Sequence, residues 1–110
     1  MFKNIKTAEQ LTQEAANKAY QDNLSALKQE RDTSLFELTH TFTDGSVIQV
    51  RPSDISNLQL AIQLGQAEDW VMADDTVRNL TVEEMTEAMN SGIAQGKVIW
   101  NDYTTKLKAL

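Results

Sequence analysis

The sequence contains no cysteine, one histidine and one proline, and these scarcities exclude several kinds of site. Without thiols the chain can form neither disulfides nor thiolate zinc sites, and it has no cysteine nucleophile. A single histidine excludes a multi-histidine metal centre within one chain. Hydrophobic runs are short, and none approaches the about 20 residues that a membrane-spanning helix needs. No apolar run follows the lysines of residues 1–6, so we expect no secretory signal there.

Basic residues are also few, and the acidic excess is concentrated in one stretch. The chain carries 10 Lys and Arg against 16 Asp and Glu, a net charge of −6. Residues 1–31 contribute +1, five basic against four acidic, which leaves −7 for residues 32–110. Seven acidic residues stand against Arg78 alone in residues 68–87. Such a surface repels phosphates, so we expect no nucleic acid and no anionic membrane as partner. The simplest interpretation is that the acidic residues increase solubility and place favourable negative charge at the N-terminus of a helix.

Residues 1–31 are predicted as a helical arm that lacks a partner. Thr7 and Gln10 have the spacing of a capping box, and no Gly or Pro interrupts the helix-forming residues that follow, as far as Arg31. The apolar residues are few and mostly small, so the helix either projects, packs closely through its alanines or pairs with a copy of itself. Self-association would use a seam of Leu11, Ala15, Tyr20, Leu24 and Leu27.

Residues 32–110 are predicted as a compact α+β domain that begins with a β-hairpin. From Phe36 to Phe42 apolar and polar residues alternate, which is typical of a half-buried strand. Asp44-Gly45 is the two-residue signal for a type I′ turn, in which both residues have positive φ. Residues 46–51 form the returning strand.

Two helices and a second pair of strands complete the predicted domain. Ser53 can cap a helix that ends at Gly65. Residues 70–73 and 76–80 read as strands joined by a turn at Asp74-Asp75. The capping box from Thr81 to Glu84 begins the last helix. The fold is thus α+β, a long N-terminal helix followed by ββαββα, without an internal repeat. Its small antiparallel sheet, four-stranded if the hairpins join, is covered by helices on one face.

Gly92 and Gly96 lie on the apolar stripe of the last helix, although each should cost about 1 kcal/mol relative to alanine. We interpret them as places where another backbone, that of the sheet, comes close; a local kink is the alternative.

Trp70 and Trp100 are expected in the core. If Trp70 lies instead on a protein-binding rim, the partner surface would be Glu68, Asp69, Trp70, Asp74 and Asp75.

Residue patterns for catalysis are lacking. His40 lies mid-strand among apolar residues and has no neighbouring nucleophile, so we expect a structural role. Carboxylates at Asp74, Asp75 and residues 83–84 could be paired for hydrolysis, but adjacent carboxylates in a turn are normally solvated. The same stretch lacks the pattern of a calcium loop, and no glycine-rich phosphate loop is present. We expect a protein that is not an enzyme and has no cofactor or metal, with a carboxylate hydrolase as the least favoured alternative.

Several short motifs occur in a characteristic order. They are Phe42-Thr43-Asp44-Gly45, then Ser53 at the head of a helix, then Trp70-Val71-Met72-Ala73-Asp74-Asp75 and Leu80-Thr81 before a long final helix. Over about residues 28–110 this order resembles a domain of unknown function found in tailed bacteriophages and prophages. Asp75 stands where the pattern of that family has Asn.

The resemblance implies a phage protein, because that domain often forms part of tail-fibre assembly proteins or tail proteins. It implies tail-fibre proteins as partners, and the cytoplasm of the bacterial host or the virion as location. The family has no agreed catalytic residues, so none is transferred. A second hypothesis is a small acidic inhibitor or decoy that binds a host protein through residues 68–87.

Overall fold

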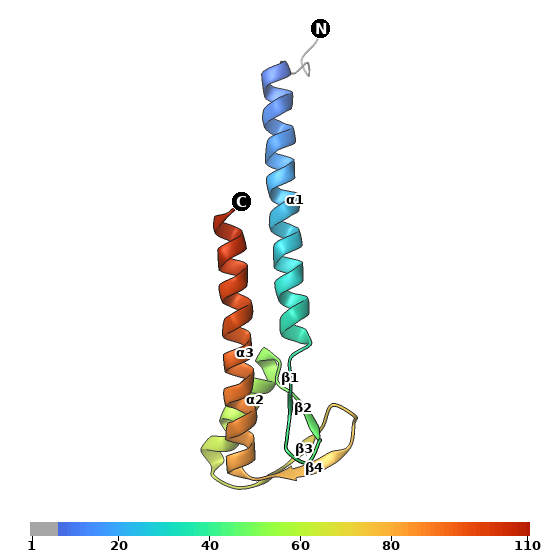
Figure 1. The fold of residues 1–110 in the computed structure, drawn as a ribbon, viewed down its shortest axis with the longest axis vertical. Helices are drawn as coiled ribbons and strands as arrows, with labels where there is room; N and C mark the ends of the chain where they lie inside the picture. Colours follow the sequence, from blue (N-terminus) through green and yellow to red (C-terminus); the bar gives the residue numbers. More distant parts are fainter. Residues whose placement is uncertain (1–6) are drawn as a thin grey trace.

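The computed structural model describes residues 7–110; residues 1–6, where no secretory signal is expected, lie outside them. The chain forms a long helix, then hairpin, helix, hairpin and helix, which confirms the predicted α+β order. The elements are α1 (Ala8–Phe36), β1 (Thr39–Thr41), β2 (Val47–Gln49), α2 (Pro52–Leu64), β3 (Glu68–Val71), β4 (Val77–Leu80) and α3 (Val82–Lys108). The molecule is elongated, 73 × 27 × 25 Å, because α1 and α3 extend far beyond the rest of the chain (Figure 1).

Two helix boundaries differ from those predicted. α1 continues past Arg31 to Phe36, because Leu35 on its last turn is buried in the core. Helix α2 begins at Pro52, so Ser53 lies inside it and is not the cap. The carboxylate of Asp54 accepts from the backbone N–H of Arg51, the N-cap residue, at 3.1 Å and satisfies the helix start instead.

The strands form two separate two-stranded antiparallel sheets, so the suggested four-stranded sheet is wrong. Only three or four residues pair in each strand, with His40 opposite Ile48 and Trp70 opposite Arg78. The two hairpins do not pair strand edge to strand edge; the backbone of the second hairpin meets that of the first through its loop. One backbone hydrogen bond, from the amide of Ala73 to the carbonyl of Val47 at 2.9 Å, marks this contact.

The first hairpin turns through three residues, so the type I′ prediction is wrong. Gly45 has the expected positive φ of +86°, but Asp44 does not. The amide of Gly45 donates to the carbonyl of Phe42 at 2.9 Å, the pattern of a turn followed by a left-handed residue. The reason is the Asp44 side chain, whose Oδ1 accepts from both the amide and the hydroxyl of Ser46 at 2.9 and 2.6 Å.

The second hairpin repeats the first at an offset of 30 residues. Asp75, with a φ of +66°, takes the left-handed position that Gly45 takes in the first loop. The Asp75 amide donates to the Met72 carbonyl at 3.0 Å, and Asp74 Oδ1 accepts from Thr76. Each hairpin then leads into a capped helix, α2 or α3. Residues 38–64 and the stretch from residue 68 onward are therefore two β-hairpin–helix units.

The sequence has no clear internal repeat, as stated above, although the structure repeats one unit, and the residues explain why. Between residues 38–50 and 68–80 the identical pairs are Asp44 with Asp74 and Val47 with Val77. The shared feature is the order of an Asp-centred turn, two strands and a helix start, which many sequences can encode. Ile48 and Arg78 occupy equivalent positions, one fully buried in the core and the other a charged residue.

The core lies where the hairpins, α2, the end of α1 and the first half of α3 meet. Its fully buried large side chains are Ile48, Val50, Leu58, Leu80 and Met85. Trp70 packs against this cluster and is partly buried. Trp100 is 47% exposed and lies between α1 and α3, so the prediction that it belongs to the core is wrong.

The two helical glycines have different surroundings. A Cβ on Gly92 would lie 2.8 Å from Val50 Cβ and 3.0 Å from the Val50 carbonyl oxygen, which confirms that the sheet comes close there. A Cβ on Gly96 would meet Leu35 Cδ2 at 3.9 Å, an ordinary contact. The prediction of a close backbone is therefore wrong for Gly96, because α1 meets α3 there through a side chain.

The paired loops predict opposite effects of substitution at Gly45 and Asp75. Gly45→Val should lower the free energy of unfolding by about 1–3 kcal/mol, because a β-branched residue is strained at positive φ. Asp75→Gly should raise it by up to about 1 kcal/mol, because it relieves a left-handed non-glycine residue. Urea unfolding of the two variants measures both changes. Equal effects of the same sign would contradict the left-handed assignment.

Candidate interaction surface

The first half of α1, residues 8–23, has no covering element in the described chain. The helix starts at a complete capping box, with Gln10 N donating to Thr7 Oγ1 at 3.1 Å and Thr7 N to Gln10 Oε1 at 2.9 Å. Every residue from 8 to 23 is exposed, among them Leu11 at 54% and Tyr20 at 46%. This half of α1, called the free half below, extends past the end of α3 (Figure 1).

The second half of α1 lies antiparallel to α3 and is fixed to it. Leu24 and Leu27 are partly buried, and Leu35 is buried. Arg31 lies over the two aromatic residues of α3, with its Cζ 4.8 Å from the centroid of the Trp100 ring and 4.7 Å from that of Tyr103. These contacts are favourable cation–π pairs.

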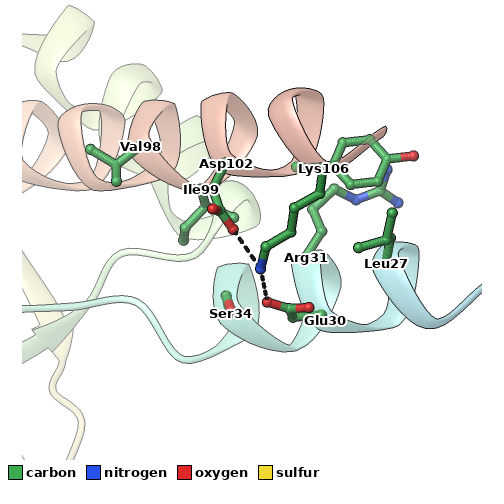
Figure 2. A pocket seen from close by; sticks show the side chains of 9 residues that line it. Leu27, Glu30, Arg31, Ser34, Val98, Ile99, Asp102 and Lys106 are labelled. Atoms are coloured by element: carbon green, nitrogen blue, oxygen red, sulfur yellow. Dashed lines mark hydrogen bonds and ion pairs between the residues drawn. The ribbon is translucent and has the colours of Figure 1, made fainter. Parts of the chain in front are cut away.

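An ion pair completes this anchor at the edge of a pocket of about 230 Å³ between the two helices (Figure 2). Lys106 Nζ contacts Glu30 Oε1 of α1 at 2.7 Å and Asp102 Oδ2 of its own helix at 3.1 Å. The hydrogen bond to Glu30, followed by that to Asp102, raises the pKa of Lys106. Apart from the buried Leu35, the groups that hold α1 against α3 are thus partly exposed, and none of them lies in the free half.

The structure divides the predicted self-association seam between two faces of α1. Leu24 and Leu27 continue at spacings of three and four to Arg31, and this face packs on α3. Tyr20 lies on the same face one turn before Leu24, and its side chain is 46% exposed. Leu11 and Ala15 are four residues apart and share another face, since each residue turns the helix by about 100°. Their face is uncovered.

The acidic residues of positions 68–87 mostly bond within the body. Asp69 Oδ1 accepts from the side chain of Asn79 at 3.0 Å, directly across the second hairpin. Glu87 Oε2 lies 2.6 Å from His40 Nε2, which joins α3 to β1 and gives His40 the structural position predicted for it.

The turn and helix-start carboxylates are also engaged, and their pKa values are lowered. The Ser46 hydroxyl and amide lower the pKa of Asp44, and the Thr76 hydroxyl and amide lower that of Asp74. Together with Asp69 and Glu87, these bonds give much of the acidic stretch a local structural use. They lend no support to a dedicated acidic binding face made of Glu68, Asp69, Trp70, Asp74 and Asp75.

Glu84 has the most connected carboxylate of this group. Its Oε1 accepts from the Thr81 backbone N–H at 3.1 Å and its Oε2 contacts Arg78 Nη2 at 2.6 Å. The Thr81 bond is the first cause of a lowered pKa for Glu84, and the charge of Arg78 adds to it.

These lowered pKa values predict that the protein loses stability in acid. Each carboxylate has a lower pKa folded than unfolded, so the unfolded chain binds protons first as the pH falls. Stability should therefore be full above the ordinary values of 3.8 for aspartate and 4.5 for glutamate and fall below them. Urea midpoints from about pH 6 to about pH 3 test this.

A double variant provides the control. Asp44→Asn with Asp74→Asn keeps an oxygen that accepts in each turn but removes two titrating groups. We expect a shallower fall of the midpoint in acid than in the unmodified chain. An equally steep fall would show that other groups set the acid response.

Within residues 7–110 no group of three or more histidine and acidic side chains is placed to hold a metal ion. In the same part of the chain, no helix is both long enough and apolar enough to cross a membrane. Comparisons with protein-family models, with curated proteins and with solved structures find no match to this chain.

The anchor between α1 and α3 was not predicted from the sequence. Its signal was present, because Leu24, Leu27, Arg31 and Leu35 keep helical spacing across the expected end of the arm. The alternation from Phe36 onward concealed it, because that pattern placed the helix end near Arg31.

Proposed function

We propose that this protein assists the assembly of phage tail fibres, without catalysis, by binding another protein through the free half of α1. The observation that carries the proposal is the exposure of residues 8–23 on every side of a helix with a complete cap. An isolated helix of about 16 residues is marginal in water. This helix continues from the half of α1 that packs on α3, which holds residues 8–23 in solvent, where a partner protein can cover them.

The side chains of the free half suit a protein partner. Tyr20 and Leu11 are the large apolar residues exposed on it, on different faces. A helix that binds in a groove uses anchors of one face, so a partner would take either Tyr20 or Leu11. Tyr20 continues the face of Leu24 and Leu27 and is the larger of the two. The free half has a net charge of −2, from Glu9, Glu14, Lys18 and Asp22. This is much smaller in magnitude than the −7 of residues 32–110. The acidic body therefore opposes a close partner more than this helix does.

The kind of partner comes from the sequence resemblance. Its motifs lie in the two hairpins and at the starts of α2 and α3, and they resemble a domain of phage tail-fibre assembly proteins and tail proteins. A packed body that presents an exposed helix fits an accessory role, in which it holds a fibre protein until the fibre assembles.

Co-expression with the tail-fibre proteins of the phage or prophage that encodes the chain tests this proposal. The tagged chain should capture one of them, and Tyr20→Lys should weaken the capture at least tenfold. Gln21→Lys is the matched control, because it puts the same charge on the adjacent exposed position. Failure of the unmodified chain to capture any fibre protein would overturn the proposal, as would equal losses with both variants.

A further inference from the structure

We propose that the outer edge of β4 binds an arginine-bearing β-hairpin of another protein, in the way that the first hairpin of this chain binds the second. The site, called the β4 edge below, consists of the backbone carbonyl of Val77 and the carboxylate oxygen Oδ2 of Asp74. The proposal goes beyond the proposed function and does not depend on the free half of α1. It also differs from the acidic face considered above, because a strand edge and one carboxylate oxygen define it.

The contact between the two hairpins of the chain provides the template for this site. The amide of Ala73 in the second hairpin donates to the carbonyl of Val47 on β2 at 2.9 Å. Arg78 Nη2 of the second hairpin contacts Asp44 Oδ2 in the loop of the first at 3.0 Å. One backbone carbonyl and one loop carboxylate of the first hairpin are thus covered by an N–H group and a guanidinium.

The second hairpin carries the same two acceptors at an offset of 30 residues. Val77 is the equivalent of Val47, and Asp74 is the equivalent of Asp44. Asp74 Oδ1 accepts from the amide and the hydroxyl of Thr76, which leaves Oδ2 for another donor. No cationic side chain of the described residues, 7–110, pairs with Asp74. The position that the Arg78 guanidinium fills beside the first loop is therefore empty beside the second.

The backbone of the second hairpin turns the Val77 carbonyl outward. The Met72 amide donates to the Thr76 carbonyl at 2.7 Å, and hydrogen-bonded pairs of an antiparallel ladder recur at every second residue. Trp70 and Arg78 therefore form such a pair, whereas the N–H and C=O groups of Val77 point away from β3. In the described part of the chain no third strand pairs with β4. An open edge of this kind can accept an added strand.

The side chains around the β4 edge define the chemistry of the partner. Val71 lies directly opposite Val77, and the two are 61% and 65% exposed, so they offer an apolar contact to a covering strand. The carboxylates of Asp75 and Glu83, before and after β4, form no hydrogen bond or ion pair within residues 7–110. Together with Asp74 they favour a cation, and they oppose a second copy of this chain, whose net charge is −6.

One contact of the first hairpin has no counterpart at the β4 edge. The Cζ of Arg78 lies 4.8 Å from the centroid of the Phe42 ring, but the equivalent residue of the second hairpin is Met72. A bound arginine therefore gains no ring contact, and the strand it accompanies meets only a short edge. We expect weak and reversible binding, as for interfaces smaller than about 1,200 Å².

A cyclic peptide that copies the second hairpin is the probe. It has the sequence of residues 68–80 with Glu68→Gln, Asp69→Asn and Asp75→Gly, which lower its acidity, and a D-proline–glycine turn closes it. The peptide is titrated into the isotope-labelled full-length chain, and amide signals are followed by NMR. We expect shifts centred on Asp74 and Val77, with a dissociation constant below about 1 mM.

Two changes to the peptide each remove one of the proposed contacts. Arg78→Gln in the peptide removes the cation and should weaken binding about tenfold or more. Methylation of the peptide's Ala73 nitrogen removes the donor to Val77 and should have a similar effect. The Ala73 N–H points out of the ladder, so its methylation leaves the hydrogen bonds of the peptide's own hairpin in place.

A matched pair of variants in the full-length chain tests the carboxylate. Asp74→Asn keeps the oxygen that accepts from Thr76 but loses the charge, so it should weaken binding of the peptide about tenfold or more. Asp75→Asn removes the same charge from the adjacent residue, which has no place in the template, and should have a much smaller effect.

Each other outcome overturns the proposal. Absence of shifts at about 1 mM peptide would show that the β4 edge binds no hairpin. Equal losses with Asp74→Asn and Asp75→Asn would show general charge attraction. Shifts confined to the first hairpin would show that the peptide replaces the chain's own second hairpin. Shifts of the β4 amides on concentrating the chain alone would show that a second copy occupies the edge.

The result is independent of the fibre protein. Tyr20→Lys, in the free half of α1, should weaken fibre capture and leave binding of the peptide unchanged. Asp74→Asn should leave fibre capture through α1 unchanged. Failure of the β4 edge and failure of the proposed function are thus seen separately.

Discussion

Gly92→Ala is expected to lower the free energy of unfolding by about 1–3 kcal/mol, the range for overpacking a core. The new Cβ would lie 2.8 Å from Val50 Cβ and 3.0 Å from the Val50 carbonyl oxygen, both on or next to the backbone of the first hairpin. Val50 is fully buried, so it has no open space into which to move. The loss from this clash exceeds the gain of about 1 kcal/mol that alanine normally brings to a helix interior.

Gly96→Ala is the matched control, one turn further along the same helix. Its Cβ would meet Leu35 Cδ2 at 3.9 Å, an ordinary van der Waals contact. We expect a gain of up to about 1 kcal/mol, because alanine restricts the unfolded chain and adds a contact to α1. Chemical unfolding of both variants gives the two signs. A gain at Gly92 would contradict the close packing of α3 on the first hairpin.

The contrast between these glycines shows where sequence reasoning ends. Both lie on the apolar stripe of the last helix, four residues apart, and local pattern treats them alike. Which one meets a backbone depends on how α3 crosses the end of the first hairpin, a tertiary fact. Features fixed by neighbouring residues were predictable, as the capping boxes at Thr7 and Thr81 and the left-handed Gly45 and Gly65 show.

The arrangement of the hairpins could not be predicted for the same reason. The signals for four strands were present, but nothing local says whether the edges of two hairpins meet. In the structure a loop contact at Ala73 replaces an edge-to-edge ladder. The candidate surface was predicted better, since it depends on an absence of large apolar residues in the arm. The sequence alone did not distinguish the two faces of the arm. The face of Tyr20, Leu24 and Leu27 differs from the other only because Leu24 and Leu27 pack on α3.

Arg78 joins the two hairpins to the start of α3, and its role follows from the repeat. The equivalent residue of the first unit, Ile48, is a fully buried core side chain. Arg78 Nη2 instead contacts Asp44 Oδ2 at 3.0 Å in the loop of the first hairpin and Glu84 Oε2 at 2.6 Å in the first turn of α3. Its Cζ also lies 4.8 Å from the centroid of the Phe42 ring.

The Arg78 guanidinium also contributes unfavourably to the stability of the fold. Its Nη1 is buried and has no hydrogen-bond partner within residues 7–110. An unsatisfied buried donor of this kind costs about 1–3 kcal/mol. The net value of Arg78 is therefore smaller than the number of its contacts suggests. Because the stem of a partly buried arginine commonly covers apolar surface, we expect part of this value to come from the stem.

Arg78→Ala and Arg78→Met separate these contributions. Alanine removes the stem and both ion pairs, so we expect the free energy of unfolding to fall by about 2–3 kcal/mol. Methionine keeps most of the length of the stem and removes the unpaired Nη1, so we expect a fall of less than about 1.5 kcal/mol. Urea unfolding of both variants at the same pH measures the difference. Equal losses for alanine and methionine would show that the ion pairs, rather than the stem, hold the second hairpin to the first loop and to α3.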